Sequence, residues 1–329
     1  MAFRVGLVGL GMAVTPHAKS LLDLKDRVQV AYAFSPSAER RRKFAERFPF
    51  PQCERLETIL EDRSVGAVLV LTPPNTHLEM VERCAAAGKH VLLEKPLDVS
   101  TARAEQLVRK ASNVKLGVVL QHRFRPAAEA LKERLKDLGQ LVSASAAIPN
   151  WRPQSYYDQP GRGTRWRDGG GVLLTQAIHT LDLFLSYTGE PAQVKSFFTT
   201  TPVHRMETED LAVAAVRFKN GALGAVHATT TAYPGFPERI ELIGTLGTAQ
   251  LEGTSLKMQI QDRPAFSFSS ESGGGGTGAD PMAFPHDWHR GVLKDFLDAI
   301  DERREPRVSG AEALKVHRFI DAILQLSAA

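Results

Sequence analysis

The sequence contains little cysteine: Cys53 and Cys84 are the two cysteines among 329 residues. Two cysteines are too few for a disulfide framework, and their spacing does not match that of metal-ligand pairs. This usage is typical of a protein in a reducing compartment, so we expect a cytoplasmic location. We expect neither thiol to be catalytic.

The sequence also lacks long apolar runs and a large excess of one charge. Its apolar stretches are far shorter than the roughly 20 residues that span a bilayer. Lysine plus arginine number 41 against 37 for aspartate plus glutamate, and no block of five or more like charges occurs. Residues 1–14 have some features of a signal peptide, but their three glycines fit a first strand and turn better. We therefore expect neither a membrane nor a nucleic acid as a partner.

The remaining composition, 43% hydrophobic and 24% charged residues, is that of a globular protein long enough for two domains. Residues 3–120 alternate short apolar runs with amphipathic stretches, which predicts a parallel sheet with crossover helices. The predicted strands are 3–8, 28–34, 67–71, 90–93 and 115–120, and the predicted helices are 16–24, 38–48, 77–87 and 101–112. The fold class is therefore α/β, with a doubly wound Rossmann domain at residues 1–122.

From about residue 123 the pattern changes. A helix is predicted at 127–138, followed by strand-like runs at 142–148, 194–199, 211–218, 222–230, 239–243 and 248–251. Asn220-Gly221 is a hairpin signal, which favours antiparallel pairing. The glycine-rich residues 269–280 predict a loop, either a lid or a solvated connection, and helices at 287–303 and 311–326 close the chain. Residues 123–329 thus predict a second α/β domain with an open, mainly antiparallel sheet.

A glycine-rich turn, G-L-G-M-A-V, occupies residues 9–14 after the first predicted strand. It has the first two glycines of the G-x-G-x-x-G/A turn, which lets the backbone approach a pyrophosphate at a helix N-terminus. Val14 stands where a third small residue is usual. Gly9, Gly11 and Met12 are candidate cofactor contacts, and an ordinary glycine-rich strand end is the alternative.

The second predicted strand ends in F-S-P-S at residues 34–37, without the acid that usually binds the ribose 2′-hydroxyl of NAD. Serine hydroxyls together with Arg40 or Arg41 at a helix start suit a 2′-phosphate instead. Ser35 and Arg40 are the candidates. We favour NADP as the cofactor and leave NAD open, because these arginines equally fit a solvated helix face.

Two more motifs follow predicted strand ends at the same sheet edge. T-P-P-N-T-H at residues 72–77 predicts a rigid wall of a cofactor cleft, with candidate contacts Thr72, Pro73, Asn75 and His77. His77 equally fits a plain first-turn helix residue. In Glu94-Lys95-Pro96, Glu94 is a candidate cofactor contact and Lys95 a candidate catalytic ammonium. A surface salt bridge between the two is the alternative for this pair.

A triglycine stretch, Gly169 to Gly171, precedes a predicted helix on which Thr175, His179 and Asp182 share one face. A lone histidine is more often a packed core residue than a base. If it faces Lys95 across a cleft, His179 becomes a candidate for proton transfer near neutral pH.

Together these motifs resemble the Gfo/Idh/MocA oxidoreductase family over nearly the whole chain. The resemblance rests on Gly9-x-Gly11, Pro73-Pro74-Asn75-x-His77, Glu94-Lys95-Pro96, Arg123-Phe124-x-Pro126, residues 169–182 and a closing pattern from His289 to Pro306. It implies a Rossmann domain followed by an α/β domain whose open sheet makes homodimers or homotetramers. It also implies NAD(P)-dependent oxidation or reduction of sugars, polyols and related compounds.

The resemblance further implies that Lys95 hydrogen-bonds the reacting oxygen and that His179 is the acid/base. The family often has Asp or Asn where this chain has Thr175, a hydroxyl that can orient a substrate oxygen but cannot offset an imidazolium charge. Two other functions stay open: a reductase of a non-sugar carbonyl or diol, and a non-catalytic dinucleotide-sensing protein.

Arginines and aromatic residues between the two predicted domains are candidates for substrate binding, because aromatic faces stack on sugar rings and guanidinium groups bind carboxylate or phosphate. A surface or subunit-contact loop is the alternative. We expect Gln121 to line the cleft floor, and no metal site, since His286 and His289 lack a third convergent donor. The substrate candidates are Arg123, Trp151, Arg152, Arg162 and Trp166.

Overall fold

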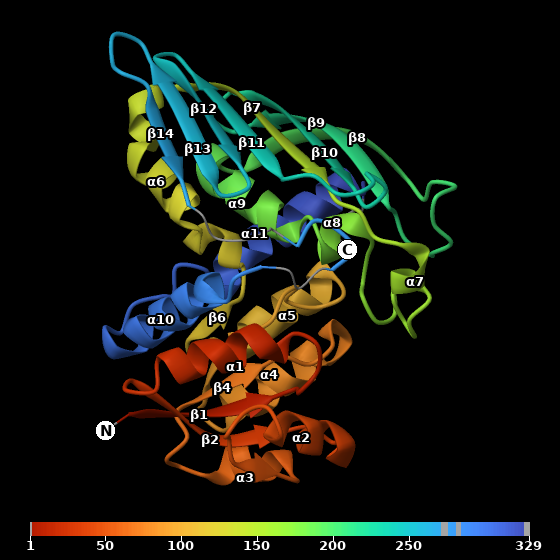
Figure 1. Ribbon diagram of the computed structural model, residues 1–329, viewed down its shortest axis with the longest axis vertical. Helices are drawn as coiled ribbons and strands as arrows, with labels where there is room; N and C mark the ends of the chain where they lie inside the picture. The colour runs from red at the N-terminus through yellow and green to blue at the C-terminus, as the bar shows by residue number, and fades with distance from the viewer. Residues whose placement is uncertain (1, 271–275, 281–283, 326–329) are drawn as a thin grey trace. The chain divides into compact units, whose positions relative to one another are not determined.

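The computed structural model describes residues 2–270, 276–280 and 284–325. The chain divides into two compact units (Figure 1). Unit 1 comprises residues 1–120 and 286–314, and unit 2 comprises residues 121–285 and 315–329. The expected domain boundary after residue 122 lies two residues from the division after residue 120. The second domain was expected to be one continuous segment, whereas residues 286–314 of that segment lie in unit 1. Residues 286–314 belong to unit 1 because α10 (Asp287–Asp301) packs on α1 (Val14–Asp23).

Unit 1 is built on a six-stranded parallel sheet in the order β3-β2-β1-β4-β5-β6. This is the doubly wound order, in which ligands bind beyond the carboxyl ends of the strands at the point where the strand order reverses, between β1 and β4. The strands are β1 (Phe3–Val8), β2 (Val28–Phe34), β3 (Gln52–Cys53), β4 (Ala67–Val70), β5 (His90–Leu93) and β6 (Leu116–Val118).

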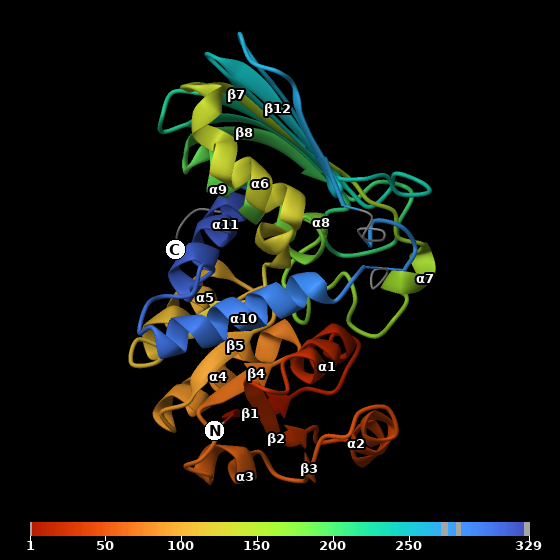
Figure 2. The ribbon, with the colours of Figure 1, turned by 60° about the vertical axis from the view of Figure 1, so that its left-hand side comes forward.

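The strands of unit 1 form because continuous apolar runs are buried on both sheet faces, as expected for parallel strands. All four residues of β4 have no exposed surface. The remaining helices of the unit are α2 (Ala38–Ala45), α3 (Leu56–Glu61), η1 (Pro74–Thr76), α4 (His77–Ala86) and α5 (Thr101–Lys110). Figure 2 shows α1 and α4 on opposite sides of this sheet.

Unit 2 contains an eight-stranded sheet in the order β14-β13-β12-β11-β7-β10-β9-β8. Among the described pairings within this second sheet, only β7–β10 is parallel, so the expected mainly antiparallel sheet is confirmed. The predicted hairpin is also present, with Gly221 in the left-handed region at φ +90°. The strands are β7 (Leu141–Pro149), β8 (Pro191–Thr199), β9 (Leu211–Phe218), β10 (Leu223–Thr229), β11 (Arg239–Gly244), β12 (Gly247–Glu252), β13 (Ser255–Ile260) and β14 (Phe266–Ser269).

One face of this sheet is covered by helices and the other is open (Figures 1 and 2). Along β9 buried and exposed residues alternate, and Phe218 packs on Phe184 of α9 with ring centroids 5.7 Å apart. The helices of the unit are η2 (Gln121–Phe124), α6 (Pro126–Arg134), η3 (Leu135–Leu138), α7 (Gln154–Tyr157), α8 (Val172–Thr175) and α9 (Ile178–Thr188), and the chain returns to unit 2 within α11 (Gly310–Ile323).

The predicted loop at 269–280 lies partly outside the described residues, because 271–275 are not described. Its end, residues 276–278, is held by the side chain of Arg152, whose guanidinium donates to the carbonyls of Gly276 and Thr277. Among the residues that the structure describes, no helix has both the length and the apolar character needed to cross a membrane.

Candidate active site

The glycine turn leaves open backbone at the start of α1. Gly9 has φ +100° and donates its N–H to the carbonyl of Phe34 at 2.9 Å. A Cβ on Gly9 would lie 2.6 Å from the Leu71 carbonyl carbon, whereas a Cβ on Gly11 would meet no heavy atom within 4 Å. Met12 is half exposed. Gly9 is therefore required by the fold, and Gly11 leaves space at a helix N-terminus, where an anion is favoured.

The end of β2 shows different roles for the two candidate arginines. Arg41 donates from Nη1 to the carbonyl of Ser35 at 2.7 Å and is held against the turn. Ser37 caps α2, because its hydroxyl accepts the N–H of Arg40 at 3.3 Å. The Arg40 side chain is exposed and forms no ion pair with another described residue. Arg40 is thus the arginine available to a ligand at this turn.

The segment after β4, residues 72–77, is held in place by hydrogen bonds of His77. His77 is fully buried, with Nε2 2.8 Å from the Thr72 carbonyl and Nδ1 3.0 Å from the Pro96 carbonyl. Burial lowers the pKa of His77. Its ring joins the loops after β4 and β5, so any effect of His77 on a cofactor is transmitted through those loops. Asn75 Oδ1 is buried and has no hydrogen-bond partner among the described residues.

Lys95 follows directly after β5, at the carboxyl edge of the sheet that also carries Gly9 and Thr72. Its N–H donates to Oε2 of Glu94 at 3.0 Å. Glu94 is 8% exposed, so this carboxylate is buried next to the lysine backbone and is not a surface group. The structure therefore gives Glu94 a role in holding the backbone of Lys95.

In unit 2 the triglycine stretch is shaped by Glu209. A Cβ on Gly171 would lie 1.8 Å from the backbone oxygen of Glu209, which is a forbidden distance. The Glu209 carboxylate accepts the N–H groups of Gly171 and Leu173, both at 3.1 Å, at the start of α8. Burial raises the pKa of Glu209, and these two backbone donors oppose the rise. The carboxylate thus caps α8 in place of a local residue.

The single predicted helix carrying Thr175 and His179 on one face is wrong. The helix is divided into α8 and α9, and the N–H groups of Gln176 and Ala177 both donate to the Val172 carbonyl, at 3.1 and 2.8 Å. The bond from Ala177 spans five residues, which is the geometry of a π-bulge, a feature frequent at functional sites. Thr175 and His179 therefore do not lie on one continuous helix.

The hydroxyl of Thr175 donates to the carbonyl of Gly171 at 2.6 Å and also contacts Oε1 of Gln176. It therefore serves the helix backbone. His179 lies in the first turn of α9, 9% exposed, with its ring 4.9 Å from the ring of His122. Gln121, in η2, is 5% exposed, and its Oε1 has no hydrogen-bond partner among the described residues.

Arg123 and Asp182 form a bidentate ion pair in unit 2. Nε and Nη2 of Arg123 donate to the two carboxylate oxygens of Asp182 at 2.7 and 2.6 Å. The pair is buried and ties η2 to α9. Arg123, which was expected to contact the substrate, is therefore used together with Asp182 to position the helix that carries His179.

The residues predicted to bind substrate divide into two groups. Arg152 is 3% exposed, and its guanidinium donates to backbone carbonyls, including that of Gly276 at 2.8 Å, so it holds a loop. Arg162 lies over the Tyr156 ring at 5.0 Å. Trp166 is 64% exposed, and Trp151 is half-buried. Arg162 and the two tryptophans are accessible to a ligand, whereas Arg152 is not.

Residues 3–122 match the model of the oxidoreductase family with an NAD-binding Rossmann fold, and residues 127–250 match the GFO/IDH/MocA C-terminal domain. The chain belongs to the Gfo/Idh/MocA oxidoreductase family. The resemblance seen in the sequence is thereby confirmed, as is the expected class of NAD-binding oxidoreductase.

Relatives in this family include dehydrogenases. The chain is 31% identical to the myo-inositol 2-dehydrogenase of Thermotoga maritima over 256 residues, which are 74% of this chain and 73% of that protein. It is also similar to the WlbA dehydrogenase from Bordetella pertussis, solved in complex with NADH and UDP-GlcNAcA, with TM-score 0.83, 25% identity and coverage of 99% and 96%. A levoglucosan dehydrogenase has the same fold, with TM-score 0.86, 22% identity and coverage of 99% and 97%.

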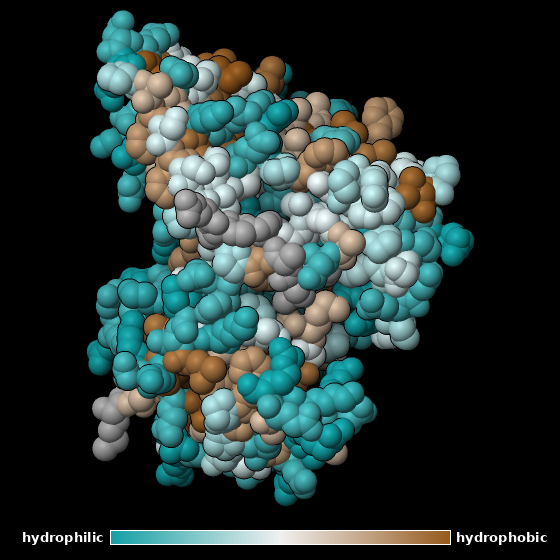
Figure 3. Space-filling view, in the orientation of Figure 1, coloured by the Kyte–Doolittle hydropathy of each residue, from teal (hydrophilic) through white to brown (hydrophobic). Residues whose placement is uncertain are grey.

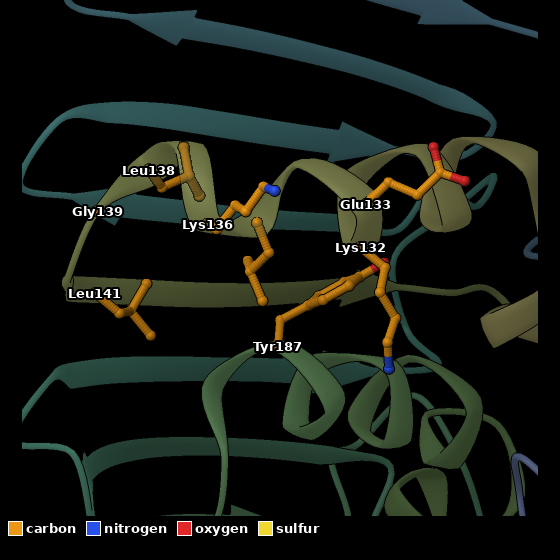
Figure 4. Close-up of a pocket in the computed structure, with 8 residues that line it drawn as sticks. Lys132, Glu133, Lys136, Leu138, Gly139, Leu141 and Tyr187 are labelled. Atoms are coloured by element: carbon orange, nitrogen blue, oxygen red, sulfur yellow. The ribbon is translucent and has the colours of Figure 1, made fainter.

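Unit 2 contains a pocket of about 440 Å³ (Figure 4). It opens between α6, η3, β7 and α9 and contains no residue that the sequence predicted for the site. The hydroxyl of Tyr187, in its wall, donates to the carbonyl of Ala128 at 2.8 Å. Its lining residues are Lys132, Glu133, Leu135, Lys136, Leu138, Gly139, Leu141 and Tyr187.

Sequence reasoning missed several residues of the site. His17 and His289 converge on Glu94, with ligand-type atoms of the three side chains all within 4.8 Å of one another. The sequence paired His289 with His286 and predicted no third convergent donor, whereas the structure groups His289 with His17 and Glu94, which come from distant parts of the chain. No local motif marks His17 or Glu209, since each acts on a segment at least 36 residues away.

Proposed function

We propose that the chain catalyses hydride transfer between a nicotinamide dinucleotide and a carbinol or carbonyl carbon of a sugar, polyol or sugar derivative. The observation that carries the proposal is the grouping of Gly9, Thr72 and Lys95 at one carboxyl edge of a doubly wound sheet. The inositol and levoglucosan dehydrogenases among the relatives support the sugar-like substrate class.

The residues of unit 1 fit a dinucleotide. Gly11 offers open backbone at the start of α1, where the helix dipole favours a pyrophosphate. Asn75 Oδ1 is a buried acceptor whose partner a ligand N–H or hydroxyl would supply. Gly9, Met12, Thr72 and Pro73 would line the cleft, with Glu94 and His77 holding its loops, and we propose Gln121 as a further cofactor contact.

A bound nicotinamide supplies the hydride acceptor or donor. In this proposal, the Lys95 ammonium donates a hydrogen bond to the reacting oxygen and stabilises developing alkoxide charge. His179 accepts or returns the hydroxyl proton. Thr175, whose hydroxyl serves the helix backbone, acts by shaping the turn before His179. Arg123 positions α9 through Asp182.

The decisive test incubates purified protein with NADP or NAD and a panel of sugars, polyols and sugar acids while the absorbance of the reduced cofactor is followed. Turnover with at least one sugar-like alcohol supports the proposal. Tight dinucleotide binding without any oxidation or reduction supports instead a dinucleotide-sensing protein, which the engaged hydroxyl of Thr175 favours. The panel includes a cyclic diol, because a trans-1,2-dihydrobenzene-1,2-diol dehydrogenase is 28% identical over 260 residues.

The two glycines of the turn predict opposite effects. Gly9→Ala is expected to destabilise the cofactor-free protein by about 1–3 kcal/mol, because φ +100° and the Leu71 backbone both oppose a side chain. Gly11→Ala should leave the free energy of unfolding within about 0.5 kcal/mol but weaken dinucleotide binding. Urea denaturation measures the free energy of unfolding, and cofactor titration measures the dinucleotide Kd. Unchanged affinity in Gly11→Ala would show that no phosphate approaches that backbone.

We propose NADP as the preferred cofactor on the basis of the exposed Arg40 beside the capped start of α2. Arg40→Ala is expected to raise the KM for NADP about tenfold, the value of one lost charge-assisted hydrogen bond, while the KM for NAD stays constant. Arg42→Ala is the matched control, because Arg42 pairs with Glu46 on the same helix. Equal changes with both cofactors would contradict a 2′-phosphate contact.

For the substrate we propose that Trp151, Trp166 and Arg162 contact a sugar ring or an anionic substituent. The UDP-GlcNAcA of the WlbA complex is a nucleotide-linked acidic sugar of the kind that such residues suit. Arg152 and Arg123 are removed from the set of direct contacts because their guanidinium groups are bonded within unit 2.

We further propose that the chain forms a homodimer or homotetramer through the open face of its second sheet. Large apolar side chains are exposed on strands of this face, and Phe197 is 88% exposed. Apolar groups also interrupt the polar surface over these strands in Figure 3. A cytoplasmic location stays our proposal, supported by the free thiols Cys53 and Cys84.

A further inference from the structure

The first turn of α1 carries a histidine that neither the glycine motif nor the lysine motif includes. His17 is 1% exposed and belongs to the helix that begins beside the glycine turn. Its Nε2 lies 2.7 Å from Oε1 of Glu94, which is 77 residues further along the chain. This contact joins the start of α1 to the end of β5 within unit 1.

Both oxygens of Glu94 are engaged. Oε1 faces His17, and Oε2 accepts the N–H of Lys95 at 3.0 Å. Burial raises the pKa of Glu94, but the hydrogen bond from His17 and the neighbouring basic groups together outweigh burial and hold that pKa at about 2. An ionised carboxylate only accepts hydrogen bonds, so His17 donates from Nε2. The resulting order of contacts is His17, Glu94 and the backbone of Lys95.

His289 of α10 holds the other side of His17. The two rings meet edge to face with centroids 4.9 Å apart and an interplanar angle of 89°. Burial lowers the pKa of His289 to about 3, so this ring stays uncharged and adds no repulsion beside the donor. The ring of His17 is therefore fixed between a carboxylate and a neutral imidazole.

The same three side chains have the composition of a metal site, two histidines and one carboxylate. Direct coordination at about 2.1 Å would replace the hydrogen bond between His17 and Glu94. That bond, at 2.7 Å, already satisfies both groups inside the protein. The contacts therefore favour a hydrogen-bonded arrangement over a coordinated ion.

We propose that His17 is a positioning residue for Lys95: it orients the Glu94 carboxylate, which in turn fixes the backbone from which the Lys95 ammonium extends. The inference rests on the proposed function of Lys95. His17 belongs to α1, the helix whose start offers open backbone to a pyrophosphate in the proposed function. The start of α1 and the backbone of Lys95 are thus joined by one short chain of contacts in unit 1.

The test uses the full chain and variants of His17 that differ in side-chain length and in whether the side chain carries an N–H donor. His17→Gln places an amide N–H close to the position of Nε2, whereas His17→Asn is shorter by one carbon and His17→Leu has no donor. We expect kcat to fall about 10- to 100-fold in the Leu and Asn variants, as for a catalytic group displaced by about 1 Å, and to stay within about threefold in the Gln variant. Dinucleotide Kd, measured by fluorescence titration, should be unchanged.

A double-mutant cycle with Lys95→Ala separates positioning from general structural damage. If His17 acts through the lysine, His17→Leu lowers kcat in the parent protein but has no further effect in the Lys95→Ala background. His90→Leu is the control, because His90 accepts the N–H of Lys115 near the opposite end of β5. Should His17→Leu fail to fold, His17→Asn takes its place in the cycle.

The outcomes distinguish this inference from the proposed function. Full activity in Lys95→Ala would overturn the role of the lysine itself. Loss of activity in Lys95→Ala together with full activity in His17→Asn and His17→Leu would overturn only the positioning role, as would additive losses in the double variant. One equivalent of a divalent metal, detected by elemental analysis and lost in His289→Ala, would replace the hydrogen-bonded arrangement with a metal site.

Discussion

Replacing Lys95 with alanine is expected to lower kcat by about 10³-fold while the dinucleotide Kd stays constant. The variant removes the ammonium that stabilises developing charge on the reacting oxygen, an interaction that is stronger in the transition state than in the ground state. The backbone contact with Glu94 at 3.0 Å does not involve the side chain and is retained. Steady-state kinetics with the best substrate of the panel and a cofactor titration measure the two quantities.

The matched control for this prediction is Lys110→Ala. Lys110 pairs with Glu82 on the surface of unit 1, where an ion pair contributes about 0–1 kcal/mol. The control should retain parental kcat and KM. A Lys95→Ala variant whose kcat equals that of the control would remove Lys95 from the reaction, and a loss confined to KM would make it a binding residue only.

Replacing His179 with alanine is expected to lower kcat by about 10²- to 10⁴-fold, the range for loss of a general acid or base. His179 is 9% exposed at the start of α9, directly after the π-bulge, and its helix is fixed by the Arg123–Asp182 pair. Because this pair does not include the imidazole, the variant should fold. Thermal denaturation is expected to show a change far smaller than the change in rate.

Chemical rescue with imidazole tests whether His179 transfers the proton. Added imidazole should restore part of the activity of His179→Ala by filling the space left by the ring, and it should leave Lys95→Ala unchanged. His286→Ala serves as the histidine control, since His286 bonds to Asp23 at an exposed position of unit 1. Equal rates for His179→Ala and this control would assign the proton transfer to another group.

Several elements of unit 1 were predicted to the residue. The strands Phe3–Val8, Val28–Phe34 and His90–Leu93 have the predicted bounds. Short apolar runs between turn residues specify such strands, because both faces of a parallel sheet must be buried. In unit 2 the β9–β10 hairpin followed from Asn220-Gly221, a signal that depends only on local backbone conformation. The short strands β13 and β14 carried weaker patterns and were not predicted.

Tertiary contacts changed the interpretation of individual side chains. Arg123 and Arg152 have the chemistry of substrate-binding residues, but buried partners take up their guanidinium groups. The helix after the triglycine stretch was expected to be continuous, and the extra hydrogen bond from Ala177 divides it. Such features depend on contacts between residues that are distant in sequence, for example the hydrogen bond from the Gly171 N–H to the Glu209 carboxylate. The hydrophobic periodicity of a sequence carries no information on contacts of this kind.

The order of short motifs along the chain was sufficient to establish the two sheets, the family and the candidate groups Lys95 and His179. Such motifs encode backbone conformation, burial and turn chemistry, which are local properties of neighbouring residues. The partners of each polar side chain were decided by folding, which brought His17 to Glu94 across 77 positions and Arg123 to Asp182 across 59. A buried charge must find its partner wherever the packed chain provides one, and sequence distance sets no limit on that choice.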